Sequence, residues 1–401
     1  MRGSLPSRAL ALAALCAAPA LLDAQAPAVS KQAALAPADR VPITLDKAAA
    51  HANVERGLDW LVGAQRTDGG WASPVCEGLT EMGFATESFY SWQMAAGGLA
   101  LVALSEAAET PARRTALEKG AQWLVASELP RRGNHWDVDN QWTGVYGLVA
   151  CAALRSDPRF ASQDWQQRID ARGRAFHAQL ERTQVPEGGW GYYDDPIFSE
   201  RPKWATSFTT AAVLPALAQA RAFGWTDQKR VLERAQDYVS ACTLPSGSYT
   251  YDLTPIPYTR IDGINNVRGG LGRVQVCNWA LASTGVKKIT PDRIRAGLEA
   301  FFAEHRFLDI AYMRPIPHEA YYQNAAYFYF FGHYYAAKAI ELLPAAEREP
   351  YYARLRPHVA KVQREDGSWC DFLGSSYMVV ASSAFALLAL QSAERGGPPA
   401  R

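Results

Sequence analysis

Residues 56–71 have the sequence Arg-Gly-Leu-Asp-Trp-Leu-Val-Gly-Ala-Gln-Arg-Thr-Asp-Gly-Gly-Trp, and this stretch decides the fold. Its first half has helical spacing, so the aromatic Trp60 and the aliphatic Leu61 lie on one buried face. The Asp68-Gly69-Gly70 turn supplies the positive φ angles with which a helix ends. Trp71 then folds back as an apolar plug, whose indole N–H needs a Gln side chain or a backbone carbonyl as its partner.

The same pattern recurs along the chain and is therefore an internal repeat. Its slots hold a basic residue, a small residue, an aromatic, an aliphatic, Gln, Gly and Trp. Five further units close at Trp136 after an insertion, at Trp190, at Tyr249, near Tyr312 in a degenerate unit, and at Trp369. A unit of roughly 55–65 residues provides two helices and a long loop.

Two kinds of helix alternate in these units. Amphipathic helices that carry the repeat are predicted at about 47–65, 111–128, 164–184, 227–242, 290–305 and 348–364. Helices that are apolar nearly all round are predicted at about 90–106, 142–155, 204–222, 272–284, 321–342 and 375–391. A helix without a polar face must be buried. The sequence therefore predicts an all-α fold, an (α/α)6 toroid or barrel of six helical hairpins.

The N-terminus has the features of a secretory signal. Arg2 and Arg8 precede an apolar run over residues 9–22, and small residues follow. Such a run is too short for a lasting membrane span. We expect a signal peptide over 1–26, an Ala/Pro-rich tether over 27–44, the toroid over 45–392 and a disordered tail over 393–401. The protein would then be secreted or periplasmic, without a transmembrane segment.

Charge and cysteine content narrow the possibilities further. The net charge of +1 and the pI near 7.6 remove the electrostatic case for nucleic-acid binding. Removing the leader leaves an odd set of cysteines, so at least one of them is unpaired or shared between chains. Cys76 and Cys370 follow the first and last closing Trp. Because a ring makes the first and sixth units neighbours, a disulfide between these two cysteines is a hypothesis for the seam.

The repeat resembles the Gln/Trp repeat of the prenyltransferase and squalene cyclase families, and the layout is similar to the terpenoid cyclase and protein prenyltransferase toroid. The resemblance covers almost the entire mature chain. It implies a central cavity surrounded by the inner helices, with chemistry near the mouth formed by the long loops. Those loops are expected at about 72–90, 130–142, 191–204, 250–272, 306–321 and 370–376.

Squalene cyclases protonate an alkene with the middle acid of an Asp-x-Asp-Asp motif. Here the nearest equivalent is Asp137-Val138-Asp139-Asn140, in which Asn140 replaces the last acid. The resemblance implies Asp139 as the proton donor, with Asp137, His135 and Asn140 in support. The alternative is that Asp137 or Asp139 caps the following helix, as acids before helices usually do.

The chain also resembles protein prenyltransferases, at residues 269–273 and at Cys277. Their zinc site needs an Asp two residues before the Cys and a His on the last inner helix. Gln275 and the His-free segment 375–378 stand at those places. One remaining thiolate does not make a tetrahedral zinc site, so we expect neither a metal nor another cofactor.

A second set of candidate site residues comes from two of the long loops. Tyr258, Arg260, Arg268, His318 and Tyr322 lie in or beside two long loops, and long loops in compact domains are often functional. Arginines could neutralise a uronate carboxylate while His or Tyr removes its α-proton, as a polysaccharide lyase requires. The alternative is that the arginines tie the loops together.

The fifth unit carries a further aromatic face. Tyr322, Tyr329 and His333 share one side of the helix predicted over 321–342. If that side points inward, it offers π surfaces to a cation or a sugar. If it points sideways, it packs between neighbouring helices.

Three functions remain open. The leading hypothesis is an acid-initiated cyclase or isomerase acting on an isoprenoid or other lipid, with rings such as Trp142 and Tyr192 around the substrate. The second is a polysaccharide lyase or hydrolase, and the third is a non-catalytic binding toroid. The partner would be a small hydrophobic molecule or a glycan, with peripheral membrane contact in the first case. An aromatic pocket containing Asp139 would favour the first hypothesis, an open Arg/His/Tyr groove the second, and a plugged centre the third.

Overall fold

The computed structural model describes residues 44–78, 81–134, 136–192, 204–253 and 263–399. The chain divides into the units Met1–Pro42 and Ile43–Arg401, and every described residue belongs to the second. The predicted signal peptide and all of the predicted tether except Thr44 lie outside the described residues.

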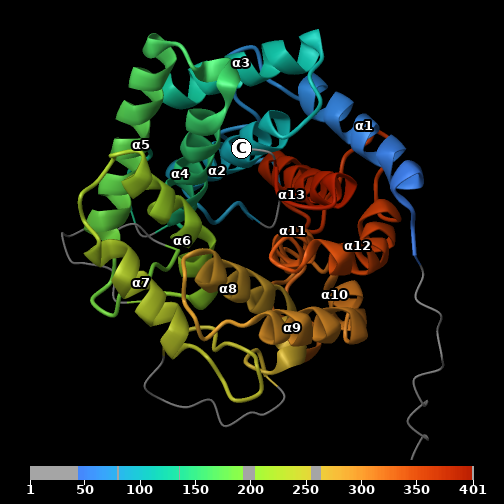
Figure 1. Ribbon diagram of the computed structural model, residues 1–401. Helices are drawn as coiled ribbons and strands as arrows, with labels where there is room; N and C mark the ends of the chain where they lie inside the picture. Colours follow the sequence, from blue (N-terminus) through green and yellow to red (C-terminus); the bar gives the residue numbers. More distant parts are fainter. Residues whose placement is uncertain (1–43, 79–80, 135, 193–203, 254–262, 400–401) are drawn as a thin grey trace, which may run out of the picture. The chain divides into compact units, whose positions relative to one another are not determined.

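Helices in the second unit alternate between an outer and an inner ring (Figure 1). The outer helices are α1 (Lys47–Gly63), α3 (Pro111–Ala126), α5 (Gln163–Thr183), α7 (Arg230–Ala241), α9 (Pro291–Ala303) and α12 (Ala345–Ala360). The inner helices are α2 (Thr86–Ser105), α4 (Gln141–Ser156), α6 (Ser207–Ala222), α8 (Leu271–Ser283), α11 (Phe328–Ile340) and α13 (Ser376–Arg395). A short helix, α10 (Arg306–Ala311), follows α9.

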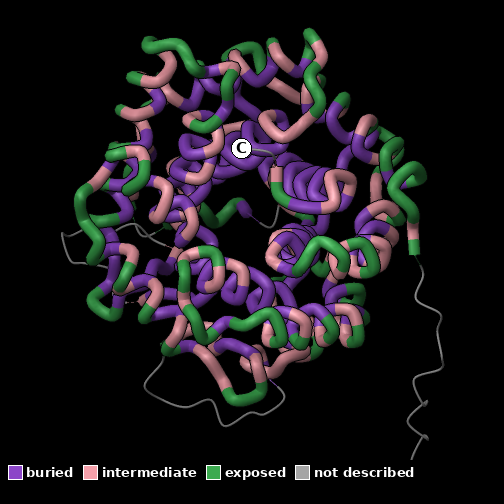
Figure 2. Tube along the Cα trace, viewed as in Figure 1, coloured by how far each residue is buried: buried purple, intermediate pink, exposed green. Residues whose placement is uncertain are grey.

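The inner ring is closed. Each inner helix packs on the next, and α13 packs on α2, so that the sixth hairpin meets the first. Burial follows the two rings: the inner helices are buried along most of their length, whereas the outer helices expose one side (Figure 2). The predicted (α/α)6 toroid is therefore confirmed.

In three units the closing Trp makes one local hydrogen bond. The indole N–H groups of Trp71, Trp190 and Trp369 donate to the carbonyl oxygens of the residues ten positions earlier, at 2.8, 2.8 and 2.9 Å. All three rings are completely buried. The buried indole thus has its polar partner, as the sequence requires.

The Gln of the repeat joins neighbouring units. Gln184 Nε2 donates to Gly188 O in its own turn at 2.7 Å and to Val231 O of the next outer helix at 2.9 Å. Gln363 makes the equivalent pair of bonds, and its partner in the next unit is Asn53 O of α1, at 2.9 Å. The same local device therefore also closes the ring between its last and first units.

The small residue of the repeat makes room for the preceding Trp. A Cβ atom on Gly120 would lie 2.6 Å from the Trp71 ring, and a Cβ atom on Gly57 would collide with the Trp369 ring. The turn Gly has a positive φ in four units, at Gly69, Gly188, Gly247 and Gly367. The Trp, Gln and small-residue slots are thus explained by contacts within the unit or with the next.

A pair of glycines in α1 gives a test of this packing. We expect Gly57→Ala to destabilise the fold by about 1–3 kcal/mol, because the added methyl group overpacks the Trp369 site. Gly63→Ala in the same helix meets no atom within 4 Å and should stabilise by about 0.4–1 kcal/mol. Urea unfolding measures both changes. Equal effects of the two substitutions would contradict the packing role of the small residue.

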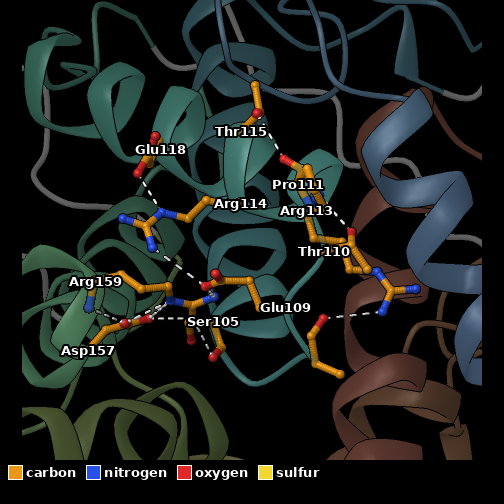
Figure 3. Close-up of polar contacts among 11 residues, drawn as sticks. Ser105, Glu109, Thr110, Pro111, Arg113, Arg114, Thr115, Glu118, Asp157 and Arg159 are labelled. Atoms are coloured by element: carbon orange, nitrogen blue, oxygen red, sulfur yellow. Dashed lines mark hydrogen bonds and ion pairs between the residues drawn. The ribbon is translucent and has the colours of Figure 1, made fainter.

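Ion pairs support the end of the ring that carries the short connections (Figure 3). Arg159 donates to Asp157 Oδ2 at 2.5 Å and to Ser105 O at the end of α2 at 2.7 Å. Arg113 of α3 donates to Glu55 of α1 at 2.8 Å. These contacts hold successive hairpins together far from the long loops.

Several expectations about individual segments were wrong. Trp136 is not a buried plug, since 68% of it is exposed. The predicted helix 321–342 begins only at Phe328, because Tyr322 and Gln323 have positive φ values of 57° and 56° and form a separate turn. At the other end of the chain, the last inner helix, predicted to end at about 391, continues to Arg395.

The disulfide hypothesis was also wrong. Cys76 and Cys370 are both free thiols, the first exposed and the second buried. Each sulfur instead lies near a carbonyl two residues further on, Gly78 O at 3.3 Å and Phe372 O at 3.0 Å. The seam is held by packing and hydrogen bonds.

Candidate functional site

Long connections gather at one end of the ring. Each runs from the C-terminal end of an outer helix to the N-terminal end of an inner helix, whereas the opposite connections are short. Because successive helices alternate in direction, all the long connections lie at the same end. This end is the mouth expected from the sequence.

A cavity of about 510 Å³ opens at the mouth, a size typical of small-molecule sites. Its wall is mainly aromatic and comes from both the inner helices and the long loops. The rings are Phe84, Trp92, Trp142, Tyr146, Tyr192, Phe208, Tyr327, Phe328, Phe331, Phe372, Tyr377 and Phe385. Three carboxylic acids, Glu81, Asp139 and Asp371, also line the cavity.

Asp139 faces this cavity from the loop before α4. Its backbone has a φ of 60°, a left-handed conformation that Asp tolerates better than most residues. Asp139 is partly exposed, and the surrounding protein desolvates its carboxyl group. This desolvation raises the pKa of Asp139 to about 7, although a hydrogen bond from Trp92 acts in the opposite direction. At neutral pH a large share of the Asp139 side chains is therefore protonated.

Asp137 holds the loop that precedes α4. Its carboxylate accepts hydrogen bonds from the backbone N–H groups of Gly133 and Asn134 at 2.7 and 2.9 Å, and it does not line the cavity. The loop is also anchored to α2, where Ser88 Oγ accepts from Val138 N at 2.7 Å. Asp137 thus positions the loop that carries Asp139.

Neither acid caps α4. The N-cap residue is Asn140, whose side chain makes no capping bond. Asn140 is completely buried and does not line the cavity. His135, the other expected supporting residue, lies outside the described residues.

Asp371 is a second cavity acid, which the sequence analysis missed. Its carboxylate accepts from Phe330 N at 3.0 Å and from Ser382 Oγ at 2.9 Å. Burial raises the pKa of Asp371 to about 7, although these hydrogen bonds lower it in part. The cavity therefore contains two carboxyl groups that titrate near neutral pH.

Glu81 joins the cavity wall to the seam of the ring. Its carboxylate accepts from Ser375 N at 2.8 Å and from Tyr377 OH at 2.6 Å, both at the start of α13. An acid at a helix N-terminus is favoured by the helix dipole. Glu81 thus fixes the last inner helix against the first long loop.

Two further polar groups of the cavity are oriented by their neighbours. His318 Nδ1 donates to Gln323 O at 2.7 Å, so its Nε2 accepts from Tyr327 OH at 2.8 Å. Tyr192 OH is hydrogen-bonded to Tyr251 OH. Of the predicted substrate-binding residues, Trp142, Tyr192 and His318 line the cavity.

The other predicted substrate-binding residues do not meet there. Arg268 donates to Glu304 at 2.9 Å and to Tyr322 OH at 2.8 Å, so these groups tie two loops together. Tyr329 points sideways, and its OH donates to His358 O at 3.0 Å. Tyr258 and Arg260 lie outside the described residues. The Arg/His/Tyr groove is therefore not assembled by the described part of the chain.

The register of the repeat contains a signal for two cavity residues. Tyr192 and Asp371 each stand two positions after a closing Trp, namely Trp190 and Trp369. By contrast, nothing in the sequence marks Trp92, Phe208 or Phe385. They belong to helices that are apolar all round, and only packing decides which side faces the axis.

Exposed apolar side chains surround the mouth. Val75, Met82, Trp136, Ile316, Tyr321 and Leu373 are each about half exposed or more, and all lie on the long connections. Among the described helices, α13 alone is long and apolar enough to cross a membrane, but it is largely buried inside the protein. A core helix meets the same criterion.

Comparison with known proteins identifies the fold. No protein-family model matches the sequence, and no curated protein matches it. Among solved structures, the type II terpene cyclase MstE from Scytonema has a TM-score of 0.52 at 13% identity, over 88% of this chain and 100% of that chain. An α-1,6-mannanase of Salegentibacter has a TM-score of 0.55 at 10% identity, over 86% and 99%.

A third similar structure is the cellobiose 2-epimerase from Spirochaeta thermophila, with a TM-score of 0.54 at 17% identity, over 87% of this chain and 96% of that chain. These three proteins share the α/α toroid but act on different substrates. At such identities the likeness establishes the fold, and the function has to be argued from the cavity.

Proposed function

We propose that this protein is an enzyme that uses Asp139 as the proton donor in an acid-initiated cyclisation or isomerisation of an isoprenoid or related lipid. The observation that carries the proposal is a carboxyl group with a pKa of about 7 in a cavity walled by aromatic rings. The terpene cyclase MstE, which has the same fold, has been solved with geranylgeranyl dihydroxybenzoate as its substrate.

The cavity supplies both parts of such a reaction. An apolar environment keeps Asp139 neutral near pH 7, so that it holds a transferable proton. Aromatic faces attract a cation through their quadrupoles, with Trp the most effective. Trp92 and Trp142 line the same cavity as the acid, so positive charge formed beside Asp139 would meet π faces rather than water.

The proposed reaction balances without a cofactor. The Asp139 proton forms a C–H bond with one alkene carbon, and the alkene π electrons supply that bond. The resulting carbocation is attacked by another alkene or shifts, and it then loses a proton from a neighbouring carbon. Ionised Asp371 is a base within the cavity wall that could take this proton. The product is an isomer of the substrate.

The apolar mouth suggests how a lipid would reach the cavity. Met82, Trp136 and Ile316 expose 70, 68 and 62% of their surface on the long connections. We infer that this rim inserts shallowly into a membrane surface, where Trp is favoured. The predicted export signal would place that surface outside the cytoplasm, and N-terminal sequencing of the mature protein tests the cleavage.

A solvent-isotope experiment tests the function. Purified protein is incubated in D2O with geranylgeranyl dihydroxybenzoate and other linear polyprenyl lipids, and in parallel with uronate polymers. We expect a cyclised or isomerised lipid that carries one solvent deuterium, because the carboxyl proton of Asp139 exchanges with water. Unsaturated uronate products, or no product from any lipid, would contradict the proposal.

Trp92→Phe tests the electrostatics of the acid separately. The substitution removes the indole N–H that stabilises the ionised carboxylate, so the pKa of Asp139 should rise further above 7. The expected result is a pH–rate profile whose alkaline limb moves to higher pH. A profile that stays unchanged or moves to lower pH would show that Trp92 does not tune the acid.

A further inference from the structure

Three histidines meet away from the central cavity, between the fifth and sixth hairpins. His305 follows α9, His333 lies in α11, and His358 lies in the last turn of α12. Ring nitrogens of all three lie within 4.8 Å of one another. His305 and His333 are buried, and His358 is partly exposed.

Hydrogen bonds fix the protons on two of the rings. His305 Nδ1 lies 3.0 Å from Asp309 Oδ2, and His333 Nδ1 lies 2.7 Å from Tyr329 O. Because a carboxylate and a carbonyl only accept, both Nδ1 atoms carry a proton, and in a neutral ring the lone pair is then on Nε2. These Nε2 atoms face each other at 3.0 Å. A cation between these two atoms, either a proton shared as a hydrogen bond or a metal ion, makes this contact attractive.

We propose that His305, His333 and His358 bind one transition-metal ion of the Zn²⁺ type through their imidazole nitrogens. Zn–N bonds of about 2.0–2.1 Å at tetrahedral angles separate two nitrogen ligands by roughly 3.3 Å, close to the Nε2–Nε2 distance of 3.0 Å. The His358 ring is stacked on the His305 ring with 3.6 Å between their centroids, so it must turn to complete the set. Its exposed side leaves a fourth position to water.

The surroundings of the rings are those of a metal site. Histidine ligands usually donate their other N–H to a carboxylate or a backbone carbonyl, as His305 and His333 do here. Asp309 is itself held by Lys361 Nζ at 3.1 Å.

The site would join the start of α10 to α11 and α12, and it is separate from the proposed proton transfer. The sequence shows no metal-ligand cluster, because these histidines come from three different helical regions. The role of the ion would be structural, linking the degenerate fifth unit to the sixth.

Metal titration of the untagged full chain tests the proposal. After chelation and dialysis, Co²⁺ should bind at one ion per chain and give the visible spectrum of a tetrahedral site without a thiolate charge-transfer band. Zn²⁺ should displace it and raise the Tm. A wild-type protein that binds neither ion in stoichiometric amount would overturn the proposal.

Variants locate the ion. We expect His358→Gln, at the partly exposed ligand, to fold normally and weaken binding at least 100-fold, and Asp309→Asn to weaken it about 10–100-fold. His177→Gln, a buried histidine in α5, and Cys76→Ser should leave binding unchanged. Tight binding that survives His358→Gln, or that is lost in Cys76→Ser, would place the metal elsewhere.

Discussion

Asp139→Asn is expected to lower the rate of acid-initiated turnover by about 10²–10⁴-fold, the range typical of a general acid. The amide has nearly the same shape as the carboxyl group but cannot release a proton to an alkene. In the wild-type protein the rate should fall as the pH rises through about 7, where Asp139 ionises. Product formation measured by mass spectrometry across pH 5–9 tests both statements.

The same substitution should stabilise the fold at alkaline pH. The pKa of Asp139 is 3.8 in an ordinary environment and about 7 in the folded protein. Its contribution to stability is therefore complete below about pH 3.8 and is lost as the pH rises to about 7. The Asn side chain of the variant does not ionise, so the variant would keep this stability at alkaline pH. At ~1.36 kcal/mol per pKa unit, the gain of the variant at pH 8 is at most about 4 kcal/mol, since water in the cavity reduces it.

Asp371→Asn is the matched control, because Asp371 lines the same cavity and also has a pKa raised to about 7. We expect a similar gain in stability but a smaller loss of turnover, since Asp371 is the proposed proton acceptor. If Asp371→Asn abolishes turnover and Asp139→Asn does not, the roles of the two acids are reversed. Unfolding curves at pH 4 and pH 8 provide the stability comparison.

Trp369→Ala is expected to destabilise the fold by about 3–5 kcal/mol. The indole is completely buried, its N–H donates to Val359 O at 2.9 Å, and its ring fills the space opposite Gly57. Because Trp369 joins the sixth unit to the first, its removal leaves a cavity at the seam of the ring. Urea unfolding followed by circular dichroism measures the loss.

Trp136→Ala is the control for this prediction. Trp136 ends the second copy of the repeat, yet 68% of it is exposed. We expect its replacement to change the stability by no more than about 0.5 kcal/mol. Similar losses in the two variants would mean that the indole contributes through something other than burial at the seam.

Local chemistry explains why the ring could be predicted. The repeat residues make contacts within their own unit or with the next, as Trp71, Gln65 and Gly69 do. One copy of the pattern is therefore enough to predict the structure of its unit. The outer and inner helices therefore appear close to their predicted positions. The failures, Trp136 and the start of α11, fall where an insertion and positive φ values interrupt the pattern.

Asp139 marks the limit of sequence reasoning about the site. Its resemblance to a cyclase acid could be seen in the sequence, but its place in the cavity depends on the loop held by Asp137 and Ser88. Arg268 and Tyr322 looked equally functional, and they bond to each other instead. Residue type alone does not distinguish a residue that lines the cavity from one that ties two loops together.

The sequence by itself determined the closed double ring, because each repeat slot acts over a short distance and recurs in neighbouring units. Only the tertiary structure decided which side chains meet: Asp371 and Asp139 in one cavity, and His305, His333 and His358 at one point. The physical reason is that the rotation of each buried helix about its axis is set by packing with its neighbours. When a helix is apolar on every side, its own sequence does not indicate which side faces the ring axis.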